Sequence, residues 1–152
     1  MELQQARLIA EKLPVLLDFS DNQRYRIVNA LMGCSEVARI QANACLFKEG
    51  DAESDFGFVL LDGAIRVENS NGFVKPVNPP ALLGEMRQFN FEGSGIRAAT
   101  VTAVEDIIVL RFSWSKLDLS LKALLNPEEC EEFTKALQIH AWMHYLERED
   151  EL

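Results

Sequence analysis

The chain has 152 residues, of which 48% are hydrophobic and 26% are charged, so its composition excludes a disordered tail and a fibrous repeat. A chain of this length is expected to form one domain with its own core. The formal net charge of −9 disfavours nucleic acid and an anionic membrane as partners, because an acidic surface repels phosphate groups.

Cysteine usage and the amino terminus favour a cytoplasmic location. Cys34, Cys45 and Cys130 are widely spaced and form no Cys-x-x-Cys pair, which suits a reducing compartment better than a disulfide framework or a zinc knuckle. Residues 1–5 contain no basic region followed by an apolar stretch, so we expect no secretory signal. No apolar run approaches the ~20 residues that a membrane span needs.

The first part of the chain is predicted to be helical. Apolar residues recur at helical spacing over residues 3–13, and Pro14 marks the end of this segment. The members of this stripe are Leu3, Ala6, Ala10 and Leu13. Ser20 and Gln23 have the spacing of a capping box, which predicts a second helix that Gly33 ends in a left-handed conformation. The apolar side of this second helix is predicted to carry Ile27, Val28 and Leu31.

From about Val37 the hydrophobic period changes to two, and turn signals follow at short intervals. Strands are expected at residues 58–61, 64–68, 73–77, 100–103 and 107–112. Asp62-Gly63 is a tight-turn dipeptide, and Asn71-Gly72 is the strongest hairpin signal in the chain. Asn78-Pro79-Pro80 ends the strand that precedes it. Short strands at this spacing are typical of a small sandwich or barrel.

The last part of the chain is predicted to be helical again. Ser113 or Ser115 can cap a short helix that reaches Leu125, and the sequence that follows, Asn126-Pro127-Glu128-Glu129, has an asparagine cap and acids at the positive end of the helix dipole. One apolar stripe of the terminal helix comprises Phe133, Leu137, Ala141 and Tyr145, and another comprises Ala136, Ile139, Met143 and Leu146. A barrel covers only one stripe. The other needs a neighbouring helix of this chain or a second copy in a homodimer.

These patterns predict an α+β fold in which a β-roll or jelly-roll barrel is flanked by N-terminal and C-terminal helices. We expect a single domain over residues 1–152. Its parts are the N-terminal helices in residues 1–36, the barrel with an irregular loop in residues 37–112, and the C-terminal helices in residues 113–152.

The irregular stretch between the predicted strands carries the candidate binding residues. Gly84 precedes a segment that can expose unpaired backbone N–H groups, which bind anions. Downstream, Arg97 can supply the planar fork that a phosphate prefers. Glu85 can accept a hydrogen bond from a ribose hydroxyl. The small residues Ala98 and Ala99 let a ligand approach the backbone.

This arrangement resembles the cyclic-nucleotide-binding domain family, which includes regulatory subunits of cyclic-AMP-dependent protein kinase and the bacterial catabolite activator. The resemblance extends from about Val15 to the terminal helix. The residues that carry it are Gly50-Asp51, 56–61, Gly63, Gly84-Glu85 and the run Arg97-Ala98-Ala99-Thr100-Val101. It implies that Glu85 binds the ribose 2′-hydroxyl, that Arg97 pairs with the cyclic phosphate, and that N–H groups near Gly84 and Ala98 complete the anion site. Ala98 stands where members that prefer cyclic GMP often carry threonine, which favours cyclic AMP.

The resemblance implies a non-enzymatic regulatory sensor without a cofactor, in which a cyclic nucleotide (cAMP or cGMP) is the ligand. Signalling would pass through the flanking helices to another protein or to a second copy, because the chain has no segment for a DNA-binding helix-turn-helix. An aromatic residue of the terminal helix would cover the purine as a lid. The candidates are Phe133, Trp142 and Tyr145.

Two other functions stay open. The first is a protein-interaction or structural module that has lost the ligand. Residues 86–89, Met-Arg-Gln-Phe, favour it because they are bulkier and more polar than the family pattern. The segment before Arg97 is also longer than usual in the family. In that module Arg97 would pair with an internal acid such as Glu85 or Glu92.

A metal-dependent enzyme of the cupin type is disfavoured because the sequence has no His-x-His. His140 and His144 lie one helical turn apart, and Glu147 follows at a spacing compatible with a zinc site. Histidines on a packed or solvated helix are far commoner than metal ligands. We therefore expect no metal.

Overall fold

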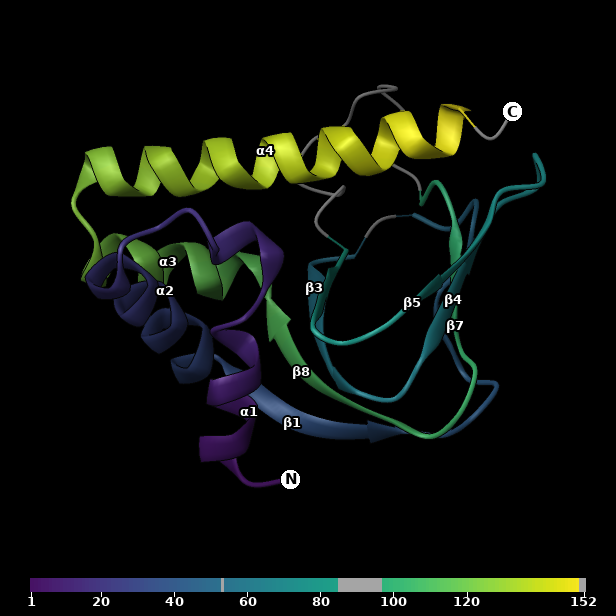
Figure 1. The fold of residues 1–152 in the computed structure, drawn as a ribbon, viewed down its shortest axis with the longest axis horizontal. Coiled ribbons are helices and arrows are strands. Elements are labelled where there is room, and N and C mark those ends of the chain that lie inside the picture. The colour runs from purple at the N-terminus through teal and green to yellow at the C-terminus, as the bar shows by residue number, and fades with distance from the viewer. Residues whose placement is uncertain (53, 85–96, 151–152) are drawn as a thin grey trace.

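The computed structural model describes residues 1–52, 54–84 and 97–150, and in these residues two antiparallel four-stranded sheets lie beside a layer of helices (Figure 1). The helical elements are α1 (Leu3–Ala10), the 3₁₀ turn η1 (Pro14–Leu16), α2 (Asp21–Gly33), α3 (Trp114–Leu124) and α4 (Pro127–Asp150). The strands are β1 (Ser35–Ile40), β2 (Cys45–Phe47), β3 (Phe56–Asp62), β4 (Ile65–Glu68), β5 (Val74–Val77), β6 (Ala81–Leu83), β7 (Thr100–Ala103) and β8 (Ile107–Ser113). The fold is therefore the predicted α+β jelly roll with flanking helices.

The two sheets have the strand orders β1-β8-β3-β6 and β2-β7-β4-β5. Side chains of a strand alternate between its two faces, and β3 is buried on both. Phe58 and Leu60 point into the core between the sheets, whereas Val59 and Leu61 point into a second core shared with the helices. The barrel and the helical layer are thus joined through the central strands of one sheet.

The structure confirms the five predicted strands as β3, β4, β5, β7 and β8, and adds β1, β2 and β6. The Asn71-Gly72 turn joins β4 to β5, with Gly72 at a φ of +94°. β6 was not predicted, because its three residues cannot show a period of two and a Pro79-Pro80 pair precedes them. It pairs with β3 in an antiparallel register. β6 leads directly into the candidate binding residues, so the strand that the sequence failed to predict is one that positions the site.

The N-terminal helices pack against the sheet that contains β3, with two departures from the predictions. Ser20 caps α2 as predicted, since its Oγ accepts a hydrogen bond from the Gln23 N–H at 3.2 Å. Leu3 is 61% exposed, because α1 buries only its small residues Ala6 and Ala10. The predicted left-handed stop at Gly33 is wrong. Among the described residues Gly33 is not one of the glycines with positive φ, and Cys34, the C-cap that follows it, has a φ of −120°.

Helix α4 lies along the top of the molecule in Figure 1, running from the other helices towards the barrel. Asn126 caps it as predicted, because the Glu129 N–H donates to Asn126 Oδ1 at 2.8 Å. The stripe that contains Phe133, Leu137 and Ala141 is buried. Ile139 and Met143 of the other stripe are 62% and 63% exposed, so no helix in the described part of this chain covers them. None of the described helices is long and apolar enough to cross a bilayer.

Candidate functional site

Gly84 directly follows the last residue of β6, and its backbone conformation strongly favours glycine. Its φ is +91°, which places it in the left-handed region that L side chains rarely adopt. A Cβ atom on Gly84 would lie 3.0 Å from Cζ of Phe47 and 3.2 Å from the backbone oxygen of Phe56. The backbone at Gly84 therefore passes directly beside the Phe47 ring at the end of β2.

Arg97 contacts the same aromatic ring as Gly84. Its side chain is buried, with 7% exposed, and its guanidinium carbon lies 3.8 Å from the centroid of the Phe47 ring. Nη2 of Arg97 donates hydrogen bonds to the backbone oxygen and the hydroxyl of Ser54 at 3.3 and 3.2 Å. A buried guanidinium held flat by stacking and hydrogen bonds has a fixed orientation, as phosphate recognition requires.

The backbone of Arg97 is anchored to the loop that follows β2. Its N–H donates to the Asp51 oxygen at 2.8 Å, and its own oxygen accepts from the Gly50 N–H at 3.0 Å. Gly50 has a φ of +88°, a left-handed backbone conformation that glycine adopts without strain. Residues 50–51 are thereby joined to Arg97, although the two segments are distant in sequence.

The next three predicted residues continue into β7. Ala98 is exposed, Ala99 is buried in the barrel core with 5% exposed, and Thr100 begins the strand. The hydroxyl of Thr100 accepts a hydrogen bond from the Glu49 N–H at 2.9 Å. Ala99 therefore contributes packing and Thr100 holds the 48–55 loop, while Ala98 is the small residue on the accessible side.

The structure brings Gly84, Arg97 and Thr100 together around residues 47–54. Glu85, the predicted ribose ligand, lies outside the described residues, as do residues 86–89 and the alternative partner Glu92. Sequence reasoning missed Phe47 and Ser54, which touch Arg97. The Gly50-Asp51 pair was a signal that this loop approaches the site. No pattern in the sequence singles out the ring or the serine.

One of the proposed lid residues is excluded by its packing. Phe133 is 5% exposed and belongs to the core between the helices, where its ring packs edge-on against Phe19 with centroids 6.2 Å apart. It lies about two helical turns after the Asn126 cap, where α4 packs against the other helices. The side chains of Trp142 and Tyr145 lie outside the described part of the structure.

The histidines of α4 are neighbours in space. The rings of His140 and His144 lie 4.3 Å apart between centroids. Within the described residues no three histidine, cysteine or acidic side chains converge in a way that could hold a metal ion. The third group considered with them, Glu147, has a side chain outside the described part.

A known family model matches the part of the chain that builds this site. The model of the cyclic nucleotide-binding domain matches residues 37–122, which contain both sheets except the first two residues of β1, and α3 up to Lys122. The chain belongs to the cyclic nucleotide-binding domain family. No curated protein matches the sequence significantly.

Solved structures show the same fold as this cyclic nucleotide-binding domain. The N-terminal domain of a transcriptional regulator from Streptomyces coelicolor has a TM-score of 0.64 and 21% identity, covering 90% of this chain and 94% of that one. The regulatory domain of Toxoplasma gondii protein kinase A, crystallised with cAMP, has a TM-score of 0.61 and 19% identity, covering 85% of this chain and 46% of that one. The Thermus thermophilus catabolite activator protein has a TM-score of 0.65 and 18% identity, covering 90% and 62%. This chain thus spans less than two thirds of the latter two structures.

Proposed function

We propose that the chain is a regulatory sensor that binds a cyclic nucleotide, preferably cyclic AMP, at Gly84, Glu85, Arg97, Ala98, Ala99 and Thr100. The observation that carries this proposal is the convergence of the Gly84 backbone and the buried Arg97 guanidinium on the ring of Phe47. A fixed guanidinium beside a glycine backbone suits a small anion better than a neutral metabolite. Membership of the family supports the ligand class, and the Toxoplasma domain crystallised with cAMP has the same fold.

The hydrogen bonds of residues 54 and 55 suggest how binding is transmitted to the helices. Arg97 donates to Ser54, and the carboxylate of the next residue, Asp55, accepts from the Ser113 hydroxyl and from the Ser115 N–H and hydroxyl. Both serines lie at the start of α3, which leads to α4. A ligand that repositions Arg97 therefore favours one arrangement of the helices through its difference in affinity.

We propose a non-enzymatic role in the cytoplasm, with the output passed through α4 to another protein or to a second copy of the chain. The net charge of −9 supports protein partners over nucleic acid or an anionic membrane. The thiols of Cys34, Cys45 and Cys130 are unpaired, which supports a reducing compartment.

The test is calorimetric titration of the chain with cyclic AMP, cyclic GMP and linear 5′-AMP. We expect cyclic AMP to bind most tightly, and Arg97→Gln to weaken it about 10- to 100-fold, because hydrogen bonds to a charged group contribute about 1.5–3 kcal/mol. Arg66→Gln is the matched control, since Arg66 pairs with Glu68 on the exposed face of β4.

A second readout does not depend on the variant. Cyclic AMP at about 100 times its dissociation constant should stabilise the wild-type chain by about 2.7 kcal/mol, which thermal unfolding detects. The absence of binding heat and of any thermal shift at millimolar nucleotide would contradict the proposal.

The contacts of Arg97 also favour one alternative, a module that keeps the fold and does not bind a nucleotide. A guanidinium that stacks on Phe47 and holds Ser54 already stabilises the protein from within. In this alternative Arg97→Gln lowers the free energy of unfolding, while cyclic nucleotides leave the thermal midpoint of the wild-type chain unchanged.

A further inference from the structure

A groove that the candidate ligand site does not use lies between the end of α2, β1, β8 and α3. Its volume is about 670 Å³. Cys34, Ser35 and Phe112 are among the residues that line it, and burial raises the pKa of the Cys34 thiol, so this part of the wall is uncharged at neutral pH. A volume of this size lies within the range of ~300–1,000 Å³ that is typical of ligand pockets.

The charged residues that line the groove have a positive net charge, whereas the net charge of the whole chain is negative. Arg111 and Lys116 both line it, in a chain that has 15 basic and 24 acidic residues. Neither cation makes an ion pair within the described residues, and Arg111 instead stacks on the ring of Phe56 at 4.2 Å. Glu36, opposite Arg111 in the sheet register, is the acid in the lining. Two cations therefore face one carboxylate.

The groove also has exposed apolar side chains beside these cations. Phe56 is 41% exposed and Leu119 is 68% exposed, although both are large hydrophobic residues. Exposed aromatic and aliphatic groups next to an arginine are the composition that protein interfaces favour. This combination suits a peptide that alternates apolar and acidic side chains.

The start of α3 explains why a peptide fits this groove better than a phosphate. Phosphates bind the free N–H groups of helix N-termini. Here the Trp114 N–H donates to the Asp55 oxygen, the Ser115 N–H donates to the Asp55 carboxylate, and the Lys116 N–H donates to the Ser113 hydroxyl. The attraction for an anion therefore comes from two separate side chains, which suits carboxylates spaced along a peptide.

We propose that this groove docks an acidic peptide segment of a partner protein. Its carboxylates pair with Arg111 and Lys116, and an apolar side chain between them packs against Phe56 and Leu119. This docking does not require a cyclic nucleotide, so it stands or fails independently of the proposed ligand.

The test uses the peptide EELEE, labelled with fluorescein for anisotropy and unlabelled for titration of the ¹⁵N-labelled chain. We expect saturable binding that weakens with salt, with chemical-shift changes centred on residues 33–36 and 111–120. The matched peptide QQLQQ should bind at least about tenfold more weakly, because it lacks the charges that pair with the two cations.

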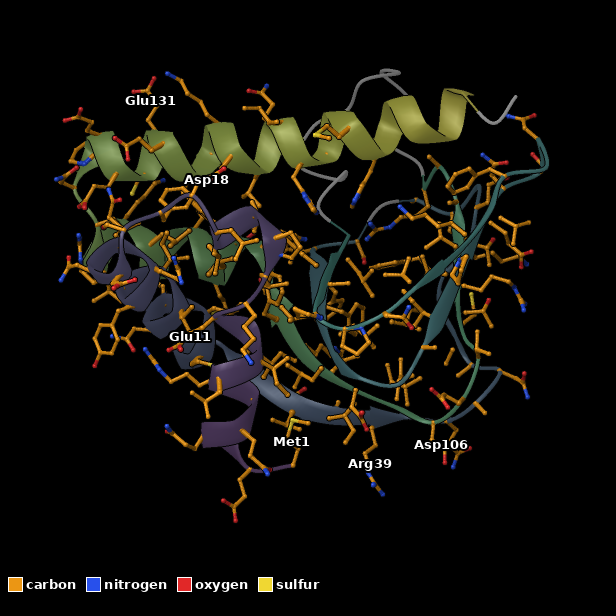
Figure 2. The ribbon with its side chains drawn as sticks, viewed as in Figure 1. Met1, Glu11, Asp18, Arg39, Asp106 and Glu131 are labelled. Carbon is orange, nitrogen blue, oxygen red and sulfur yellow. The ribbon has the colours of Figure 1, made fainter. Side chains whose placement is uncertain are left out.

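Two double variants change the net charge of the chain by the same amount, one inside the groove and one elsewhere on the surface. Arg111→Glu with Lys116→Glu should weaken EELEE binding by about tenfold or more. Arg39→Glu with Lys135→Glu should leave it within about twofold by the same reasoning, because Arg39 lies at the end of the barrel away from α4 (Figure 2) and Lys135 pairs with Glu131 on α4. Circular dichroism verifies that both double variants fold.

Three results would overturn the proposal. The first is no binding of EELEE at millimolar concentration, and the second is shift changes that centre on other residues. The third is inorganic phosphate that binds the groove as tightly as the peptide does, which would make it a small-anion site. The shift map of the wild-type chain decides the question even if a variant fails to fold.

Discussion

Gly84 combines two separate constraints at one residue of the candidate site. Its φ of +91° is strained for any L side chain, and a Cβ would press against Phe47 and the Phe56 oxygen at 3.0 and 3.2 Å. Gly72 has a similar φ of +94°, but a Cβ there would meet nothing within 4 Å. The two glycines therefore separate the cost of backbone strain from the cost of crowding.

We expect Gly84→Ala to lower the free energy of unfolding by about 2–3 kcal/mol, and Gly72→Ala by about 1 kcal/mol. The difference reflects the displacement of the Phe47 ring, which also carries Arg97. Urea denaturation of the two variants and the wild type measures it. Equal losses for the two substitutions would show that the Phe47 ring moves aside at no cost.

The residue scale also shows how far the sequence predicted the site. Gly84 and Arg97 were identified because glycine and arginine have distinctive backbone and charge properties, and because their motifs resemble those of a known family. Phe47 and Ser54 were not, because any barrel contains many phenylalanines and serines, and only the folded chain shows which of them touch Arg97.

At the scale of elements, α4 is attached to α2 by an ion pair at its first turn. Nη1 and Nη2 of Arg26 donate to the two carboxylate oxygens of Glu129 at 2.7 and 2.5 Å. The Glu129 carboxylate also accepts from the Asn126 N–H. The hydrogen bonds from Arg26 are the main reason that the pKa of Glu129 falls from 4.5 to about 2.

This shift predicts a pH dependence with a definite sign. Because the pKa of Glu129 is lower in the folded chain, its contribution to stability is present above about pH 4.5 and is lost as the pH falls towards 2. We therefore expect the wild type to be more stable than Glu129→Gln near neutral pH, and this advantage to disappear near pH 2.

Urea denaturation midpoints of the wild type and of Glu129→Gln, recorded from neutral pH to pH 2, measure this difference in stability. Glu131→Gln is the control, because Glu131 pairs with Lys135 on α4 with 67% of its side chain exposed (Figure 2). An advantage of the wild type over Glu129→Gln that stays constant from neutral pH to pH 2 would refute the role of this pair.

The elements themselves were largely predictable. The caps at Ser20, Ser113 and Asn126 were confirmed because a cap is a contact between neighbours in sequence. Helix α2 ends at Gly33 as predicted, but the predicted left-handed conformation was wrong, because a glycine can end a helix in more than one way and the chain continues here directly into β1.

At the scale of the whole molecule, α4 exposes a stripe that the rest of the described chain leaves uncovered. Ile139 and Met143 are separated by one helical turn and are 62% and 63% exposed, while the opposite stripe is buried. This is the surface through which we propose self-association of the sensor, since pairing two such stripes removes apolar area from water.

We expect the wild-type chain to sediment as a dimer at high micromolar concentration, and Ile139→Glu with Met143→Glu to raise its dissociation constant at least about tenfold. Analytical ultracentrifugation measures this. Leu3→Glu with Leu8→Glu is the control, because both residues are exposed apolar positions on α1, 61% and 51% accessible. A wild-type chain that remains monomeric would rule out self-association through α4.

A family resemblance pointed to Gly84 and Arg97, while residue type and spacing by themselves determined the helical ends of the chain, five of the eight described strands and the turn at Asn71-Gly72. These depend on interactions between near neighbours, which residue type and spacing reveal. Only the tertiary structure decided that Phe133 faces the helical core, that Arg97 stacks on Phe47, and that Arg111 and Lys116 share one groove. Such outcomes depend on which faces of distant elements meet, and that is set by the packing of the two cores as a whole.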